Sequence, residues 1–116
     1  MKKVNDIAAQ GDVLIRRIEK VPKTAVEIFE TKEVPGKLIT AHSETGHHHV
    51  IDAKKAKFFV DPADTMVGYI SVFDKHADLE HLRDYDKHET LRLLTGDYEL
   101  RRQREWSPEG WRQIAD

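Results

Sequence analysis

Histidine is the residue type whose number and spacing most strongly suggest chemistry in this sequence. The chain of 116 residues has seven histidines, and three of them are consecutive in the segment TGHHH at residues 45–49. If this segment is extended, side chains alternate between its two faces, so His47 and His49 lie on one face and His48 on the other. Two imidazoles placed in this way can bind one transition metal, with nitrogen–metal distances of about 2.0–2.1 Å for zinc. We therefore predict that His47 and His49 form a pair of metal ligands.

Two later histidines are the main candidates to complete such a site, because a zinc site uses three or four protein ligands. His81 and His88 are separated by the spacing of two helical turns, and in a loop both would still be able to point inward. The predicted site binds one divalent transition metal, with zinc preferred, through His47, His49, His81 and His88. Three ligands would leave an open position that can activate water or bind a small anion, whereas four would make a closed structural site.

The other histidines have simpler interpretations. Ordinary hydrogen bonds or solvent exposure explain His42, His48 and His76 without a metal, although a high histidine count also suggests pH sensing near neutrality. Carboxylates near the later histidine pair can serve as further ligands, or can orient a ligand ring by hydrogen bonding. These carboxylates are Asp84, Asp86 and Glu89.

A second charged motif, RRQREW at residues 101–106, lies near the C-terminus. Its arginines suggest an anion site, because the guanidinium fork binds phosphate or carboxylate and Trp106 would be able to stack on a base. The same residues also suit an edge strand whose charges oppose aggregation, with Glu105 paired to an arginine. We favour the edge strand, because three arginines in a chain with a net charge of −2 produce a weak positive field.

Composition excludes several classes of function. The chain has no Cys, which rules out disulfides, thiolate nucleophiles, iron–sulfur clusters and cysteine zinc sites. With 19 basic and 21 acidic residues, nucleic acid is not expected as a partner. The motifs of serine hydrolases, P-loop proteins and HExxH metalloproteases are absent. No apolar run approaches the ~20 residues of a membrane span and no signal peptide is recognisable, so we expect a cytoplasmic protein without a membrane partner.

Short apolar bursts, rather than long helical stripes, predict a mainly β fold in a single domain of residues 1–116. Segments of alternating or β-branched residues, separated by Gly, Pro and Asp, mark the expected strands. They are residues 13–18, 24–31, 37–40, 48–51, 56–60 and 66–73. Such a set of strands fits a small β-barrel or a two-sheet roll, because both leave few exposed sheet edges.

One segment allows a helix instead. Leu79, Leu82 and Tyr85 recur at helical spacing, so a short helix around residues 76–92 is an alternative to a strand followed by a polar loop. After it, residues 91–102 are expected to form a hairpin that turns at Thr95-Gly96-Asp97. A further turn is expected at residues 107–110, where Pro and Gly occur.

The order of motifs resembles a group of small uncharacterised bacterial and phage proteins, over about residues 10–116. The motifs that carry the similarity are QGDVL at residues 10–14, TGHHH at 45–49, GDY at 96–98 and QREW at 103–106. The resemblance implies that His47, His49, His81 and His88 are the matching histidines of the group, and it implies no activity.

A weaker similarity is to cupin-type barrels, whose first motif places a Gly before His-x-His on a strand and whose second motif supplies another His. The sequence departs from this pattern, since Asp52 is the single carboxylate where cupins have Glu, and His88 precedes Gly96 instead of following it. The similarity therefore implies a cupin-like architecture by analogy, and a fold does not specify a function.

These features together predict a small histidine-rich β protein that binds a divalent transition metal and has a small-molecule or hydrolytic role. Its compatible partners are a small anionic ligand, a protein or a second copy of the chain. The alternative is a metal-free accessory or interaction module of a phage or mobile-element system, which would bind a protein or RNA partner through a polar face of histidines and arginines. The sequence leaves open whether the protein is an enzyme.

Overall fold

The computed structural model describes residues 2–4, 6–42, 48–82, 90–102, 104–107 and 110–113, with backbone alone for Lys2 and the last two segments. Eleven β-strands and no helix occur in these residues, so the predicted mainly β fold is confirmed. The strands are β1 (Lys2–Val4), β2 (Ile7–Gln10), β3 (Val13–Ile18), β4 (Val26–Ile28), β5 (Lys37–Ala41), β6 (His49–Asp52), β7 (Ala56–Asp61), β8 (Asp64–His81), β9 (Leu91–Arg102), β10 (Arg104–Ser107) and β11 (Gly110–Gln113). Within the same residues, no helix is long and apolar enough to cross a membrane.

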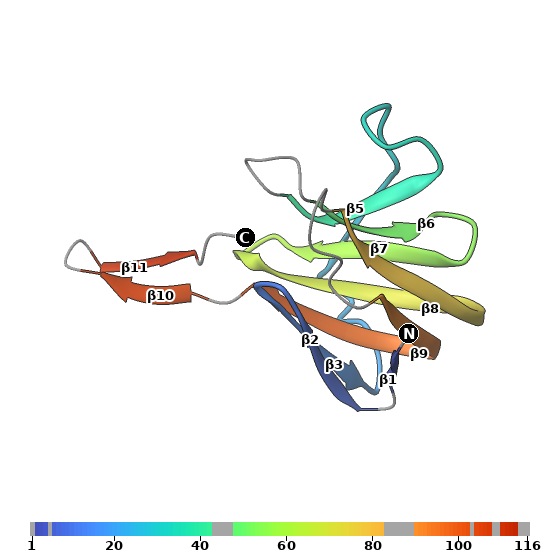
Figure 1. Cartoon of the computed structure of the whole chain (residues 1–116), viewed down its shortest axis with the longest axis horizontal. Coiled ribbons are helices and arrows are strands. Elements are labelled where there is room, and N and C mark those ends of the chain that lie inside the picture. The colour runs from blue at the N-terminus through green and yellow to red at the C-terminus, as the bar shows by residue number, and fades with distance from the viewer. Residues whose placement is uncertain are drawn as a thin grey trace.

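Nine strands form one sheet around the two longest strands, β8 and β9 (Figure 1). These two are antiparallel and pair from Val67 opposite Arg101 to Leu79 opposite Leu91. On its other edge, β8 pairs with β7 and then with β6. The other edge of β9 pairs with β3 and with the parallel strand β1. The main path through the sheet is therefore β2-β3-β9-β8-β6-β5.

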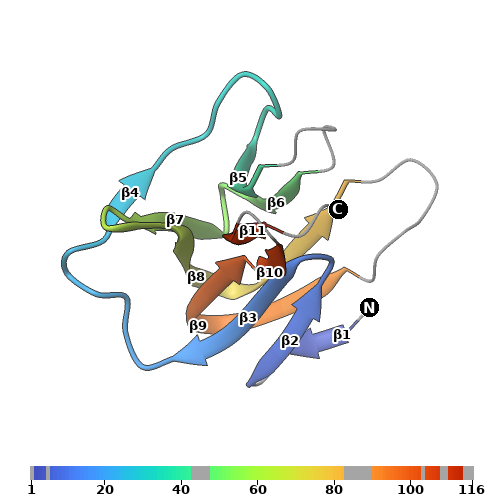
Figure 2. The same ribbon diagram turned by 90° about the vertical axis from the view of Figure 1, so that its left-hand side faces the viewer.

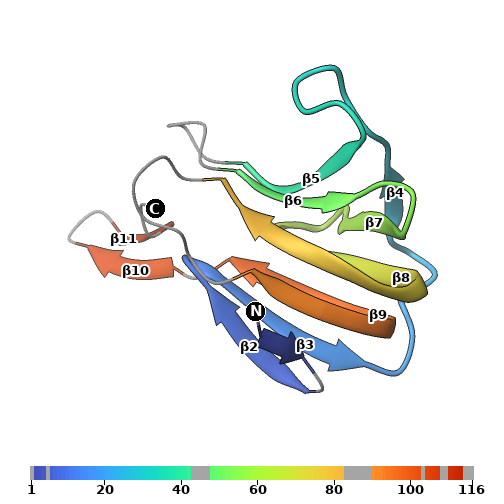
Figure 3. The same cartoon turned by 45° about the vertical axis from the view of Figure 1, so that its right-hand side comes forward.

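The sheet curls around its own core (Figure 2). In Figure 3, β4 to β7 lie on one side of β8, and β1 to β3 lie with β9 on the other. Strand alternation turns apolar side chains into the space between, including the fully buried Val13, Ile15, Ile51 and Leu79. Burial of each such side chain is worth roughly 1.5–3 kcal/mol, so this core provides the main stabilisation of the fold.

The helix considered around residues 76–92 is wrong wherever that segment is described, because β8 continues to His81 and β9 begins at Leu91. Ala77, Leu79 and His81 are buried, while the residues between them are partly exposed. This is the two-residue period of a strand, which the helical spacing of the leucines obscured. Residues 83–89 lie outside the described part of the chain.

The hairpin expected at residues 91–102 is also wrong, because this segment is one continuous strand, β9. Gly96 has a φ of 142° in the middle of the strand and lies opposite Val72, where the register with β8 shifts before His76. Gly96 therefore accommodates an irregularity in the strand pairing, which is a common position for glycine in sheets, and the chain does not reverse there.

The C-terminal strands β10 and β11 form a separate antiparallel pair, which extends to one side of the main sheet in Figure 1. Ser107 pairs with Gly110, so the chain reverses between them as the sequence predicts.

The main sheet is open, since its path ends at β2 on one side and at β5 on the other. The predicted closed barrel and cupin-like architecture are therefore not confirmed. Side chains of β2 and of the turn after it nevertheless contact β6, which is next to the end strand β5.

An ion pair between Asp78 of β8 and Arg92 of β9 allows an experimental test of the register of these two strands. Asp78 lies opposite Arg92, which donates from Nε to Oδ1 at 2.9 Å and from Nη2 to Oδ2 at 3.2 Å. These hydrogen bonds hold the pKa of the Asp78 carboxyl below its ordinary value of 3.8. A carboxyl whose pKa is lowered by folding stabilises the fold above the unfolded-state pKa, and this contribution is lost as the pH falls through the folded-state value.

We therefore expect Asp78→Asn to lower the midpoint of thermal unfolding modestly at about pH 7, with the difference from the parent protein shrinking towards about pH 2. Asp74→Asn, at an exposed position on the same strand, is the matched control and should have the smaller effect at neutral pH. An Asp78→Asn protein that loses the same stability at both pH values would contradict the assigned ion pair.

Candidate functional site

Two of the histidines predicted as metal ligands lie side by side in the core. His49 is the first residue of β6 and His81 is the last residue of β8, and the two are directly paired across the strands. Their rings stack with centroids 3.9 Å apart and 13° between the ring planes. Both side chains are buried, and His49 is completely so. The other two predicted ligands, His47 and His88, lie outside the described residues.

Contacts on both sides hold the start of β6 in place. In β5, the hydroxyl of Thr40 donates to the carbonyl of His49 at 3.1 Å, at a point where the β5–β6 register shifts. After β8, the amide of Leu82 donates to the carbonyl of His48 at 2.9 Å. The backbone of the histidine segment is therefore fixed from β5 and from the end of β8.

Gln10, the last residue of β2, determines which nitrogen of His49 carries a proton. Its side-chain Nε2 donates to the carbonyl of Leu79 at 2.8 Å, which leaves Oε1 facing Nδ1 of His49 at 2.9 Å. An amide oxygen can only accept a hydrogen bond, so Nδ1 of His49 must donate. In the neutral ring the lone pair is then on Nε2, where it is available to a metal ion.

Asp12 faces this nitrogen from the turn between β2 and β3. Gly11 has a φ of 57°, a conformation that favours glycine in a tight turn. The turn places Asp12 in the core, where 1% of its side chain is exposed and Oδ1 lies 3.3 Å from Nε2 of His49. Lone pairs on a carboxylate oxygen and a neutral imidazole repel each other at this distance. The two atoms are therefore placed to share a proton or to bind one cation.

The separation of these two atoms suits two ligands of one metal ion. In a tetrahedral zinc site with bonds of about 2.0–2.1 Å, neighbouring ligand atoms are about 3.3 Å apart. The distance from Asp12 to His49 is 3.3 Å, just beyond the usual range of about 2.7–3.2 Å for an N–H···O hydrogen bond. The two side chains could thus bind a cation with little movement.

Arg102, at the end of β9, connects this pair of residues to β5. Its Nη2 lies 3.6 Å from Oδ2 of Asp12, and the same nitrogen donates to the carbonyl of His42. Arg101 instead pairs with Glu99 at 2.7 Å. For Arg101 the edge-strand interpretation is wrong, because this residue is paired with Leu14 of β3 on one side and with Val67 of β8 on the other.

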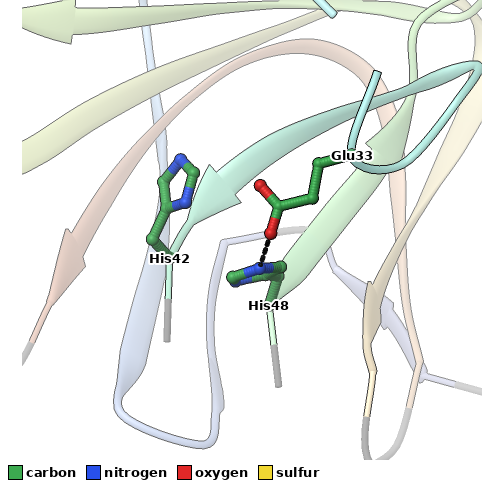
Figure 4. Close-up of side chains that lie close together, drawn as sticks. All are labelled: Glu33, His42 and His48. Atoms are coloured by element: carbon green, nitrogen blue, oxygen red, sulfur yellow. Dashed lines mark hydrogen bonds and ion pairs between the residues drawn. The ribbon is translucent and has the colours of Figure 1, made fainter. Parts of the chain in front are cut away.

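A second group of donor side chains gathers around His48 (Figure 4). Nε2 of His48 lies 2.8 Å from Oε1 of Glu33. The ring of His42 is edge-on to that of His48, with centroids 5.1 Å apart and 70° between the planes. One ligand atom from each of Glu33, His42 and His48 lies within 4.8 Å of the other two. His48 is buried, whereas Glu33 and His42 are exposed.

A small cavity lies beside these groups. It has a volume of about 190 Å³ and is lined mainly by apolar side chains of β5, β7 and β8, with His42 and Arg102 contributing to its polar wall. A cavity of this size has room for a few water molecules or a small anion.

Sequence alone does not single out Gln10, Asp12 or Glu33. The first two belong to the QGDVL motif at residues 10–14, which is the signal in the sequence that points to them. Glu33 lies between β4 and β5, in a segment with several other charged residues, and no pattern distinguishes it from them.

The chain belongs to a family of domains of unknown function, DUF8820, whose model matches residues 9–103. The matched range contains Gln10, Asp12, His49, His81 and Arg102. No curated protein and no solved structure matches the chain. Membership of an uncharacterised family is thus confirmed, whereas the individual motifs and the cupin resemblance are not.

The hydrogen bonds of Gln10 predict the tautomer of His49. We expect long-range ¹H–¹⁵N NMR spectra of metal-free protein to show a proton on Nδ1 of His49 at every pH at which the fold persists, because Nδ1 donates to Gln10. Gln10→Ala should abolish this preference, because it removes the oxygen that accepts from Nδ1 and leaves the Asp12 carboxylate facing Nε2. A neutral His49 with its proton on Nε2 in the parent protein would contradict the assignment.

Proposed function

We propose that this protein binds one divalent transition metal, with zinc the first choice, where the β2–β3 turn meets β6. Nε2 of His49 and Oδ1 of Asp12 are the two central donors. His81 is the next ligand, and His47 and His88 are the further histidines that the sequence predicts for the same ion. Imidazole nitrogen and carboxylate oxygen are both common ligands of zinc and of other divalent transition metals.

The fixed orientation of His49 is the observation that most supports this proposal. The carbonyl of Leu79, the amide of Gln10 and Nδ1 of His49 form a chain of hydrogen bonds that directs Nε2 towards Asp12. Histidines that bind metals commonly donate their other ring N–H to an oxygen atom, which orients the ring and makes it a better ligand. Gln10 would have this role.

His81 would have to turn its ring to join the same ion. The rings of His49 and His81 are stacked with 13° between their planes, and the lone pairs of an imidazole lie in the ring plane, so the two rings do not point at one common atom as they stand. The backbone pairing across β6 and β8 keeps the two side chains next to each other.

The burial of the donors favours a structural centre over a catalytic one. The side chains of His49 and Asp12 are 0% and 1% exposed, which leaves little access for a substrate. A metal here would connect the two ends of the open sheet and give it a barrel-like closure through side chains. A small-molecule or hydrolytic role would require an open coordination position that the cavity beside Arg102 can reach.

Elemental analysis of protein purified without a tag tests the proposal. We expect about one divalent metal ion per chain after dialysis, and its loss in the double variant Asp12→Asn/His49→Ala. Removal of the metal should lower the stability of the parent protein, because an ion present at 100 times its Kd contributes about 2.7 kcal/mol. The matched control is His76→Ala, at a β8 histidine outside both donor groups, which should retain the metal.

A second variant keeps the test valid if the double variant does not fold. Gln10→Ala retains every proposed donor and should weaken metal binding about 10–100-fold, as is typical when an orienting hydrogen bond is lost. A parent protein that contains no metal and gains no stability when zinc is added would contradict the proposal. It would support the metal-free interaction module instead.

A further inference from the structure

We propose that Glu33, His42 and His48 form a second, solvent-accessible site for a divalent transition metal. The three side chains come from separate parts of the chain: Glu33 lies in the segment between β4 and β5, His42 directly follows β5, and His48 directly precedes β6. Their ligand atoms nevertheless lie within 4.8 Å of one another (Figure 4). The fold has therefore brought together donors that sequence spacing does not connect.

The donor set has the composition of known transition-metal sites. Two imidazoles and one carboxylate are the protein ligands of several zinc enzymes and of the non-haem iron centres, where open positions are filled by water or substrate. Nε2 of His48 and Oε1 of Glu33 are 2.8 Å apart, so a proton joins them when no metal is present. A bound metal would replace this proton and move the two atoms to about 3.3 Å, the spacing of ligands around zinc.

The site combines one fixed donor with two adjustable donors. The side chain of His48 is 8% exposed, and that of Glu33 is 56% exposed. His42 is also exposed, although its backbone carbonyl is held by Arg102. The buried ring thus provides a fixed nitrogen, and the two exposed side chains can close on an ion at little cost in desolvation. The coordination positions facing solvent would remain open.

This site is separate from the centre proposed at His49. Consecutive residues of an extended segment point to opposite sides, and accordingly His48 contacts Glu33 while His49 contacts Gln10 and Asp12. We expect the second site to bind more weakly and to exchange its ion faster, because two of its three ligands are exposed and the site has direct access to water.

Calorimetric titration with zinc at about pH 7.5 tests the proposal, on parent protein dialysed so that it retains any tightly bound ion. We expect one further equivalent of zinc to bind, and His42→Ala and Glu33→Gln each to weaken this binding at least about 10-fold. Because protons compete for the histidines, the same binding should weaken strongly at about pH 5.5. His76→Ala is the matched control and should leave the titration unchanged.

The experiments distinguish failure of the proposed centre at His49 from failure of the second site at Glu33, His42 and His48. Failure of the centre at His49 would appear as missing metal in the dialysed protein, and the weaker equivalent would still depend on His42. The second site is contradicted if the parent protein binds no further zinc, or if His42→Ala and Glu33→Gln bind it as the parent does. Both variants change exposed side chains, and circular dichroism would verify their fold.

Discussion

The contacts of Gln10 and Asp12 with His49 join segments that are far apart in the path of the open sheet. In the path of the sheet, β2 is at one end and β6 is next to the other end. Polar groups buried without partners cost roughly 1–3 kcal/mol each, so a small protein retains such a cluster in its core only when its members satisfy one another or bind something. The hydrogen bonds from Leu79 through Gln10 to His49 meet this requirement at one side of the imidazole. At the other side, Nε2 of His49 faces Asp12, which also lies 3.6 Å from Arg102.

A proton and a metal ion between Asp12 and His49 would have different consequences for the fold. A proton on Nε2 would make an imidazolium–carboxylate pair, which would tie the strands together without any ligand. A metal ion would make the same connection more strongly and would make folding depend on the supply of metal. The 3.3 Å separation of the two atoms is compatible with either arrangement.

The consecutive residues His48 and His49 belong to two different groups of donor side chains. Because side chains alternate, His49 enters the core and His48 joins Glu33 and His42 on the other side. Arg102 contacts Asp12 of the first group and the carbonyl of His42 of the second. The charged C-terminal end of β9 is therefore part of the framework of both groups, and these contacts accompany the burial of the Arg102 side chain, which is 16% exposed.

Local patterns in the sequence predicted the strands well but not the contacts between distant segments. The alternation of apolar residues identified most strands of the sheet, and alternation along residues 47–49 separated the side of His49 from that of His48. The turn proposed at Gly96 was wrong, because glycine in a strand irregularity and glycine in a turn have the same local signal.

The site could be predicted only in part, for a related reason. Gln10 is 39 residues from His49 and 69 from Leu79 in the sequence. Contacts of this length depend on how the sheet curls, which no local periodicity records. Asp12 and Glu33 were missed because a carboxylate in a turn or a charged loop is usually an exposed side chain. The pairing of His49 with His81 brings together one member of each predicted histidine pair.

The most direct measurement is a crystal structure of tag-free protein with anomalous diffraction data collected above and below the zinc absorption edge. For the proposed metal centre, we expect an anomalous peak between Nε2 of His49 and Oδ1 of Asp12, at about 2.0–2.2 Å from each atom. A structure of zinc-supplied protein without a peak at this position, in which Nε2 of His49 donates a short hydrogen bond directly to Asp12, would contradict it.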